Sequence, residues 1–272
     1  MNTSLTLLAI LLILTPLLKG QKEHQTTENT LSAYQLQDLY QLEDNQANFS
    51  GTLFLSKSYF RCSANNRFLL KELMTKGIGT TAIYHQNAIQ LTVEHFGFRE
   101  YGELEIGMGY GRLFGKKFAL GMQFHYLFNH ASRYPSIHSI TFDISASYKI
   151  NNRICMGFSI YNPARLKRGI SGKENPYLPL IFRIDFYYEM NKKLFLYSNI
   201  EKELFTYFRI CCGSSYSIGK NISLLVGFCL PNPELYGGIR LMWKYIHLDI
   251  CSAFDFKIGF SPSLSLIIPF SL

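Results

Sequence analysis

The chain has 272 residues, of which 47% are hydrophobic and 15% aromatic, and it carries a formal net charge of +8. This length is enough for one large domain or two small ones. Basic chains bind nucleic acid when their cations gather on one element, but here the Lys and Arg residues are spread over many separate segments. We therefore expect no nucleic-acid partner.

The N-terminal residues 1–20 contain an apolar run from Leu5 to Leu18, which is followed closely by Gly20. The run is shorter than the roughly 20 apolar residues of a membrane-spanning helix, and a small residue follows it, as in a cleaved export signal. We expect residues 1–20 to be a signal peptide, with an uncleaved N-terminal anchor as the alternative. Residues 21–50 are polar, and we expect them to form a short amphipathic helix between Leu31 and Leu42 or a lumenal hatch.

From Thr52 onward, apolar and polar residues alternate along the sequence. In the segment 118–129, large apolar residues stand at the even positions, and small or polar residues stand at most of the odd ones. A similar alternation recurs in the segments 103–113, 140–148, 180–188, 246–251 and 263–271. A period of two indicates β-strands that have one apolar and one polar face.

The predicted strands are about 9 to 13 residues long, which suits a tilted membrane-spanning strand and exceeds the usual length of about five or six. Short, mostly basic connections such as 115–117 and 191–193 roughly alternate with longer ones such as Arg61–Gly77 and Asn162–Pro179. Periplasmic turns and surface loops alternate in this way in outer-membrane proteins. We therefore predict an all-β fold, namely a transmembrane antiparallel β-barrel of about 14 strands over residues 51–272, in the outer membrane of a Gram-negative bacterium.

A series of short motifs resembles a known family of barrels through its order and spacing. The resemblance covers most of the chain from Ala47 to the end, and its motifs are Ala47–Gly51, Asn66–Leu73, Phe96–Tyr101, Ile106–Arg112, Tyr161–Pro163, Leu178–Pro179, Ile200–Glu203 and Gly259–Pro262. They resemble the PorV/PorQ-type outer-membrane barrels. The resemblance implies a barrel of about 14 strands, similar to FadL-like fatty-acid channels. It also implies an N-terminal segment near the lumen and an accessory role in type IX secretion.

The polar face of the predicted wall carries acidic and basic residues together. They are Glu103, Glu105, Gln123, His125, Asp143, Arg183, Asp185, Glu201, Arg209, Arg240, His247 and Asp249. One interpretation is a solute path that is lined with charge. The alternative is an interior filled by compensating ion pairs, because buried charges need partners.

The sequence predicts a protein that is not an enzyme and that holds no metal or cofactor. His125 and Asp143 are expected to meet across adjacent strands, but neither has an evident nucleophile, and no Gly-x-Ser-x-Gly elbow is present. Cysteine and histidine spacing typical of zinc sites is absent as well. The glycines of the segment Gly107–Gly111 have the wrong spacing for a nucleotide loop, and we expect them to let large aromatic side chains of neighbouring strands pack.

The six cysteines are expected to be small apolar residues of the wall. Cys211 and Cys212 are neighbours, so they would point to opposite faces of one strand. The sequence leaves open whether one pair of the six forms a disulfide.

The predicted surface loop Asn162–Pro179 is rich in cations. Its basic residues are Arg165, Lys167, Arg168 and Lys173, against Glu174 as the acidic one. We expect them to contact lipopolysaccharide or a protein partner through charge complementarity, with an ordinary solvated loop as the alternative.

Two functions follow from these patterns. The first is a non-catalytic accessory or scaffold role, as the resemblance to PorV/PorQ implies, with exported proteins or a secretion complex as partners and outer-membrane lipid around the wall. The alternative is a FadL-like channel for small hydrophobic molecules, in which residues 21–50 would serve as a lumenal hatch beside walls rich in Phe and Tyr.

Overall fold

The computed structural model describes residues 48–55, 57–169, 177–204, 206, 208–243 and 245–271. The predicted signal peptide and the predicted amphipathic helix lie outside the described residues. The described helices are short and of the 3-10 type, namely η3 (Phe49–Phe54), η4 (Arg67–Leu69) and η5 (Lys71–Leu73). Among the described residues, no helix is long and apolar enough to cross a membrane.

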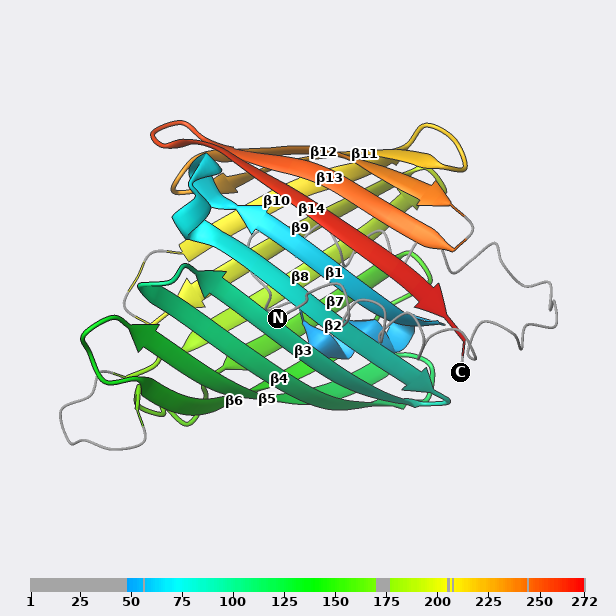
Figure 1. Ribbon diagram of the computed structural model, residues 1–272. Coiled ribbons are helices and arrows are strands. Elements are labelled where there is room, and N and C mark those ends of the chain that lie inside the picture. The colour runs from blue at the N-terminus through cyan, green and yellow to red at the C-terminus, as the bar shows by residue number, and fades with distance from the viewer. Residues whose placement is uncertain are drawn as a thin grey trace. The chain divides into compact units, whose positions relative to one another are not determined.

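The strands form one closed antiparallel barrel, in which β1 pairs with β14 and every other strand pairs with its neighbours in sequence (Figure 1). The strands are β1 (Ser58–Asn66), β2 (Met74–Tyr84), β3 (Asn87–Gly97), β4 (Tyr101–Phe114), β5 (Phe118–Ala131), β6 (Ile137–Lys149), β7 (Ile154–Tyr161), β8 (Ile181–Asn191), β9 (Leu194–Glu203), β10 (Phe208–Ser217), β11 (Ile222–Leu230), β12 (Glu234–Trp243), β13 (Ile246–Asp255) and β14 (Gly259–Phe270). The predicted fold class and the predicted number of strands are confirmed.

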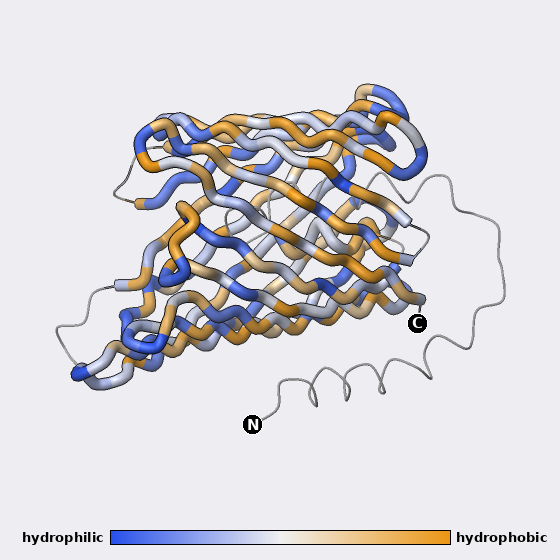
Figure 2. The backbone as a smooth tube through the Cα atoms, turned by 45° about the horizontal axis from the view of Figure 1, so that its top comes forward, coloured by the Kyte–Doolittle hydropathy of each residue, from blue (hydrophilic) through white to orange (hydrophobic). Residues whose placement is uncertain are grey.

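The alternation of the sequence separates the two faces of the wall. In β5, the even-numbered residues from 118 to 126 are exposed and the odd-numbered residues between them are buried. The exposed positions around the barrel carry large apolar side chains, for example Met108 at 57%, Phe124 at 53% and Val226 at 60% exposure. Figure 2 shows the resulting change of hydropathy from residue to residue along the strands. Because the closed ring has no sheet edge and its outer face is apolar, the barrel is built to cross a lipid bilayer.

The two ends of the barrel differ in their connections. The chain enters β1 at Ser58 and leaves β14 at Phe270 at the end where the strands are joined by short turns (right in Figure 1). The opposite end carries longer connections, among them the one between β7 and β8 (left in Figure 1). In outer-membrane barrels, the end with short turns faces the periplasm and the end with long loops faces the cell exterior.

The predicted loop Arg61–Gly77 is mostly strand, so this prediction is wrong. Strand β1 continues to Asn66 and β2 begins at Met74, which leaves only the short helices η4 and η5 between them. The stretch resembled a loop because it is rich in polar residues. In the strand part of this stretch, Arg61 faces the lumen, where its Nε donates a hydrogen bond to Ser265 Oγ at 3.1 Å.

The wall also begins later than the alternation indicated. Thr52 is not in a strand but in η3, because its Oγ1 donates to the carbonyl oxygen of Phe49 at 2.7 Å and closes a helical turn. The first strand begins only at Ser58.

Cys211 of β10 and Cys229 of β11 lie directly opposite each other on the lumenal face and form a disulfide. The hydroxyl of Tyr236 on β12 donates to Cys229 Sγ at 2.6 Å. The other cysteines, Cys62, Cys155, Cys212 and Cys251, are not in disulfides. The wall thus contains one disulfide, which the sequence had left open, and four cysteines that keep their thiols.

Alkylation under denaturing, non-reducing conditions should therefore modify four cysteines, and alkylation after reduction should modify all six. Intact-mass measurement counts the added groups. The variant Cys211→Ser should expose Cys229 and give five reactive thiols without reductant. Modification of every cysteine in the unreduced wild-type protein would contradict the disulfide.

Arg240 of β12 and Asp249 of β13 form an ion pair inside the barrel. The two residues are directly opposite in register, and Arg240 Nε and Nη2 donate to Asp249 Oδ1 and Oδ2 at 2.6 and 2.8 Å. Arg240 is only 1% exposed. A two-point bond between buried charges tolerates no slip of register, so this pair fixes β12 against β13.

We expect Asp249→Ala to lower the free energy of unfolding by about 3 to 5 kcal/mol, because it leaves a buried guanidinium without its partner. Urea unfolding, followed by the gel mobility of unboiled samples, measures this loss. Glu100→Ala removes an exposed carboxylate and should change the stability by less than about 0.5 kcal/mol. Equal stability of the two variants would show that the pair does not hold the wall.

Candidate functional site

The lumen contains a short piece of the chain, Asn48–Leu55, which we call the lumenal segment. It includes η3 and packs against β3, β4, β5 and β6 inside the ring of strands (Figure 1). The amide of Gly51 donates to the carbonyl oxygen of Asn48 at 3.1 Å, and the bond from Thr52 Oγ1 closes the next turn. These turns press the side chain of Phe49 onto the wall, where it is 1% exposed.

Glycines of β4 and β5 make room for the ring of Phe49. A Cβ at Gly109, Gly111 or Gly121 would lie 3.2, 3.1 or 2.8 Å from atoms of this ring. Gly111 and Gly121 are direct partners in the ladder, so the bare surface extends across both strands. Leu53, which is 4% exposed, packs beside the ring over Gly111. We call Gly109, Gly111 and Gly121 the glycine slot. Together they form a flat apolar surface on which one aromatic ring packs.

The sequence predicted that the glycines of the segment Gly107–Gly111, which include Gly109 and Gly111 of the slot, let aromatic side chains of neighbouring strands pack. The structure corrects the source of the aromatic ring, which comes from the lumenal segment. The predicted role of the glycines, to leave space for an aromatic ring, is the same, because a side chain at these positions of either strand would occupy that space.

Polar contacts hold the lumenal segment on its other side. Ser50 N donates to Ser145 Oγ of β6 at 3.1 Å, and Ser50 Oγ lies 2.7 Å from Ser147 Oγ. Asn48 Nδ2 donates to Asp185 Oδ2 of β8 at 3.3 Å. A neutral hydrogen bond typically contributes only about 0.5 to 1.5 kcal/mol, and one to a charged group such as the Asp185 carboxylate about 1.5 to 3 kcal/mol. These bonds position the segment on the wall and add to the apolar burial of Phe49 and Leu53.

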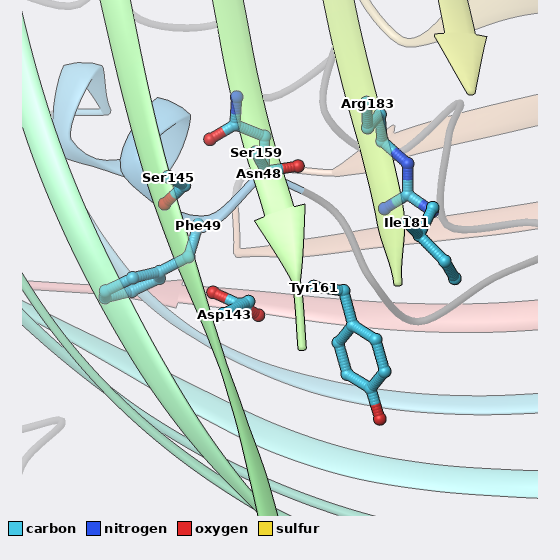
Figure 3. Close-up of a pocket in the computed structure, with 8 residues that line it drawn as sticks. All are labelled: Asn48, Phe49, Asp143, Ser145, Ser159, Tyr161, Ile181 and Arg183. Carbon is cyan, nitrogen blue, oxygen red and sulfur yellow. The ribbon is translucent and has the colours of Figure 1, made fainter. Parts of the chain in front are cut away.

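A small cavity lies between the lumenal segment and strands β6, β7 and β8 (Figure 3). Asn48 and Phe49 line it from the segment, and Asp143, Tyr161 and Arg183 are among the residues that line it from the wall. Its volume of about 10 Å³ corresponds to roughly one water molecule. A larger molecule would fit at this level only if the lumenal segment moved.

His125 of β5 joins two carboxylates beside this cavity. Its Nδ1 lies 2.7 Å from Glu105 Oε1 of β4, and its Nε2 lies 2.9 Å from Asp143 Oδ2 of β6. The structure thus brings His125 and Asp143 together, as the sequence suggested. Because both ring nitrogens face carboxylates, neither is available to activate a hydroxyl or thiol nucleophile. The cluster is an ionic bridge between three strands.

Other predicted lumenal charges form ion pairs across the wall. Arg183 Nη2 of β8 donates to Glu201 Oε2 of β9 at 2.6 Å, and Arg209 Nη2 of β10 donates to Glu234 Oε2 of β12 at 3.3 Å. With the pair of Arg240 and Asp249, these contacts favour the interpretation of an interior filled by compensating charges.

The remaining predicted polar residues also face inward and are mostly hydrogen-bonded. Asp185 accepts from Asn48 and from Asn199 Nδ2 at 2.7 Å. Gln123 donates to Gln90, Glu103 accepts from Asn129, and His247 is buried. In the described part of the chain, no group of three His, Cys, Asp or Glu side chains is arranged as a metal site.

The predicted basic residues of the loop between β7 and β8 contact the protein itself. Arg168 Nη2 lies 3.4 Å from Glu103 Oε1 at the end of β4. Arg165 and Lys167 lie 5.2 and 5.3 Å from the centre of the Tyr177 ring. Lys173 lies outside the described residues. Their contact with lipopolysaccharide or a partner stays a prediction.

Sequence reasoning missed the residues that fill the lumen. Phe49 was assigned to a polar segment and Leu53 to the wall, yet both are buried inside the barrel. The available signal was an aromatic residue between Asn48 and Ser50, upstream of strands whose polar face is rich in glycine. Because such glycines leave space on the inner face, they indicate that something else packs there.

We expect Gly121→Val to displace the lumenal segment, because the added Cβ would approach Phe49 Cδ1 to 2.8 Å. Chymotrypsin should then cut after Phe49, which the wild-type lumen protects, and mass spectrometry detects the cut. Gly237→Val is the matched control, since Gly237 is in a strand and has nothing within 4 Å of its Cβ position. Equal protection in both variants would mean that the slot does not hold the segment.

Comparison with known proteins shows similarity in fold. No protein-family model matches the chain, and no curated protein matches its sequence. The Pseudomonas putida toluene transporter TodX matches 83% of this chain and 93% of its own, with a TM-score of 0.65 at 8% identity. The CymD monoaromatic hydrocarbon channel matches 82% of this chain and 93% of its own, with a TM-score of 0.63 at 8% identity.

A Pseudomonas aeruginosa FadL homologue is also similar, with a TM-score of 0.54 at 10% identity over 82% of this chain and 91% of that one. At this level of identity the likeness shows the fold alone. Together with the even number of strands and the apolar outer face of the closed barrel, this fold places the chain in the outer membrane of a Gram-negative bacterium.

Proposed function

We propose that the barrel is a conduit for small hydrophobic molecules across the outer membrane, and that the lumenal segment closes it. The observation that carries the proposal is the position of Phe49. Its ring lies in the glycine slot and lines a cavity that has room for roughly one water. The glycine slot has the shape of an aromatic ring and is filled by the ring of Phe49. A ligand with an aromatic ring can therefore bind there in place of Phe49.

Apolar surface inside the barrel supports a hydrophobic cargo. Leu55, Tyr59 and Ile267 form one buried cluster in the interior, on the side of β1 and β14. A second cluster joins Tyr197, Leu225 and Cys251 on strands β9, β11 and β13. An apolar molecule that came into contact with these side chains would gain free energy.

The fold comparison supports the same reading, because TodX and CymD are described as a toluene transporter and a monoaromatic hydrocarbon channel. A role as an enzyme finds no support in this site, since His125 is held between carboxylates. The PorV/PorQ-like accessory role and the binding of exported proteins rest on the sequence resemblance and stay predictions. The hatch predicted for residues 21–50 overlaps the lumenal segment at Asn48–Ser50, and its other residues lie outside the described ones.

The double variant Phe49→Ala/Leu53→Ala should increase entry of toluene into proteoliposomes severalfold, because each truncation removes about 1.5 to 3 kcal/mol of apolar burial that holds the segment in place. Uptake of labelled toluene relative to protein-free vesicles gives the rate. Phe124→Ala/Val226→Ala changes exposed residues of the outer face and should leave the rate near that of the wild type. No uptake by wild type or double variant would rule out the conduit.

A further inference from the structure

One oxygen of Asp143 is buried without a partner beside the glycine slot. Asp143 is 8% exposed; its Oδ2 bonds to His125. Its Oδ1 is buried and has no hydrogen-bond partner among the described residues. Asp143 and Phe49 both line the cavity. Figure 3 shows Asp143 and Phe49 among the residues that line this cavity. A buried carboxylate oxygen without a hydrogen bond costs free energy, so a ligand that donates a hydrogen bond to it is stabilised there.

The charge balance around the cavity favours a cationic donor over a neutral one. The ionisable groups on β4 to β9 near it are Glu105, His125, Asp143, Arg183, Asp185 and Glu201. Even with the imidazole counted as positive, four carboxylates face two cations. The guanidinium of Arg183 is already bonded to Glu201, and the two oxygens of Asp185 accept from neutral amides. This part of the lumen is therefore negative, and a positive group would be stabilised there.

The apolar surface beside Asp143 favours a ligand whose remaining part is an aromatic ring. The glycine slot accepts a flat aromatic ring, and Phe49 demonstrates the fit. Tyr161 and Ile181 add apolar surface on the opposite side of the cavity. A ligand that replaced Phe49 would therefore place its ring over the glycines, and a short side chain would reach Asp143 Oδ1.

From this geometry we infer that the conduit is selective for small aromatic amines, with the ring in the glycine slot and the ammonium group on Asp143 Oδ1. The inference rests on the proposed function, because the ligand enters only when the lumenal segment withdraws. It narrows the cargo from hydrophobic molecules in general to those that combine an aromatic ring with one positive donor.

Two probes of nearly equal shape test this inference, namely benzylamine, which carries an ammonium group, and toluene, which carries none. Saturation-transfer difference NMR on the purified full chain in detergent, with empty micelles as reference, gives the Kd of each. We expect benzylamine to bind the wild-type protein more tightly than toluene. In Asp143→Asn its Kd should rise about tenfold or more, since a charge-assisted hydrogen bond is lost, while the Kd of toluene stays the same.

Glu234→Gln is the matched control, because it neutralises a lumenal carboxylate that lies on β12 and pairs with Arg209. It should leave both Kd values unchanged, and the gel mobility of unboiled samples confirms that each variant is folded. Equal loss of benzylamine binding in Glu234→Gln would overturn the assignment to Asp143. Binding of toluene without benzylamine would overturn the selectivity but leave the conduit standing. Failure of both probes to bind the wild type would reject the conduit and the inference together.

Discussion

A chain that crosses hydrocarbon must pair its backbone amides and carbonyls within the protein, because lipid offers them no partner. In this protein the pairing of β1 with β14 meets that requirement by leaving no strand at an edge. Every wall residue then points either to lipid or to the lumen, and a shift by one residue would exchange the two faces. The dyad pattern of the sequence is a direct consequence of this closure. So are the ion pairs, since polar side chains that point inward have only one another as partners.

Closure also creates an interior that its own wall does not fill evenly. On β4 and β5 the lumenal positions Gly109, Gly111 and Gly121 carry no side chain, and the lumenal segment packs there. On β9 the side chain of Tyr197 extends over Gly213 of β10 and reaches Gly227 of β11. Glycines thus serve two purposes in one barrel. On one side they accommodate a ring from the wall itself, and on the other a ring from a segment that belongs to no strand.

The wall was predictable from the sequence because its signal is repeated many times over. The alternation in a segment such as 118–129 indicates a strand, its length and its two faces. The short connections on either side predict that it pairs with the strands before and after it, as β5 does with β4 and β6. The contents of the lumen were not predictable in this way. The position of Phe49 depends on glycines about sixty residues further along the chain, and local patterns carry no information on such distant contacts. For the same reason the strand character of residues near Arg61 was missed, since polar lumenal residues resemble a loop when the partner strand is unknown.

The contacts of the lumenal segment differ in kind from those of the wall, and this difference bears on gating. Arg240 and Asp249 are held by a buried two-point ionic bond, and breaking such a buried pair is strongly destabilising. The segment is held by apolar burial of Phe49 and Leu53 and by hydrogen bonds of Asn48 and Ser50. Water can replace the hydrogen bonds, and an apolar ligand in the slot can recover the burial, at about 1.5 to 3 kcal/mol for each large side chain. A ligand that fits the slot therefore lowers the free energy of displacing the segment, whereas water alone does not. On this reasoning the proposed conduit would be opened by its own cargo while the wall around it stays fixed.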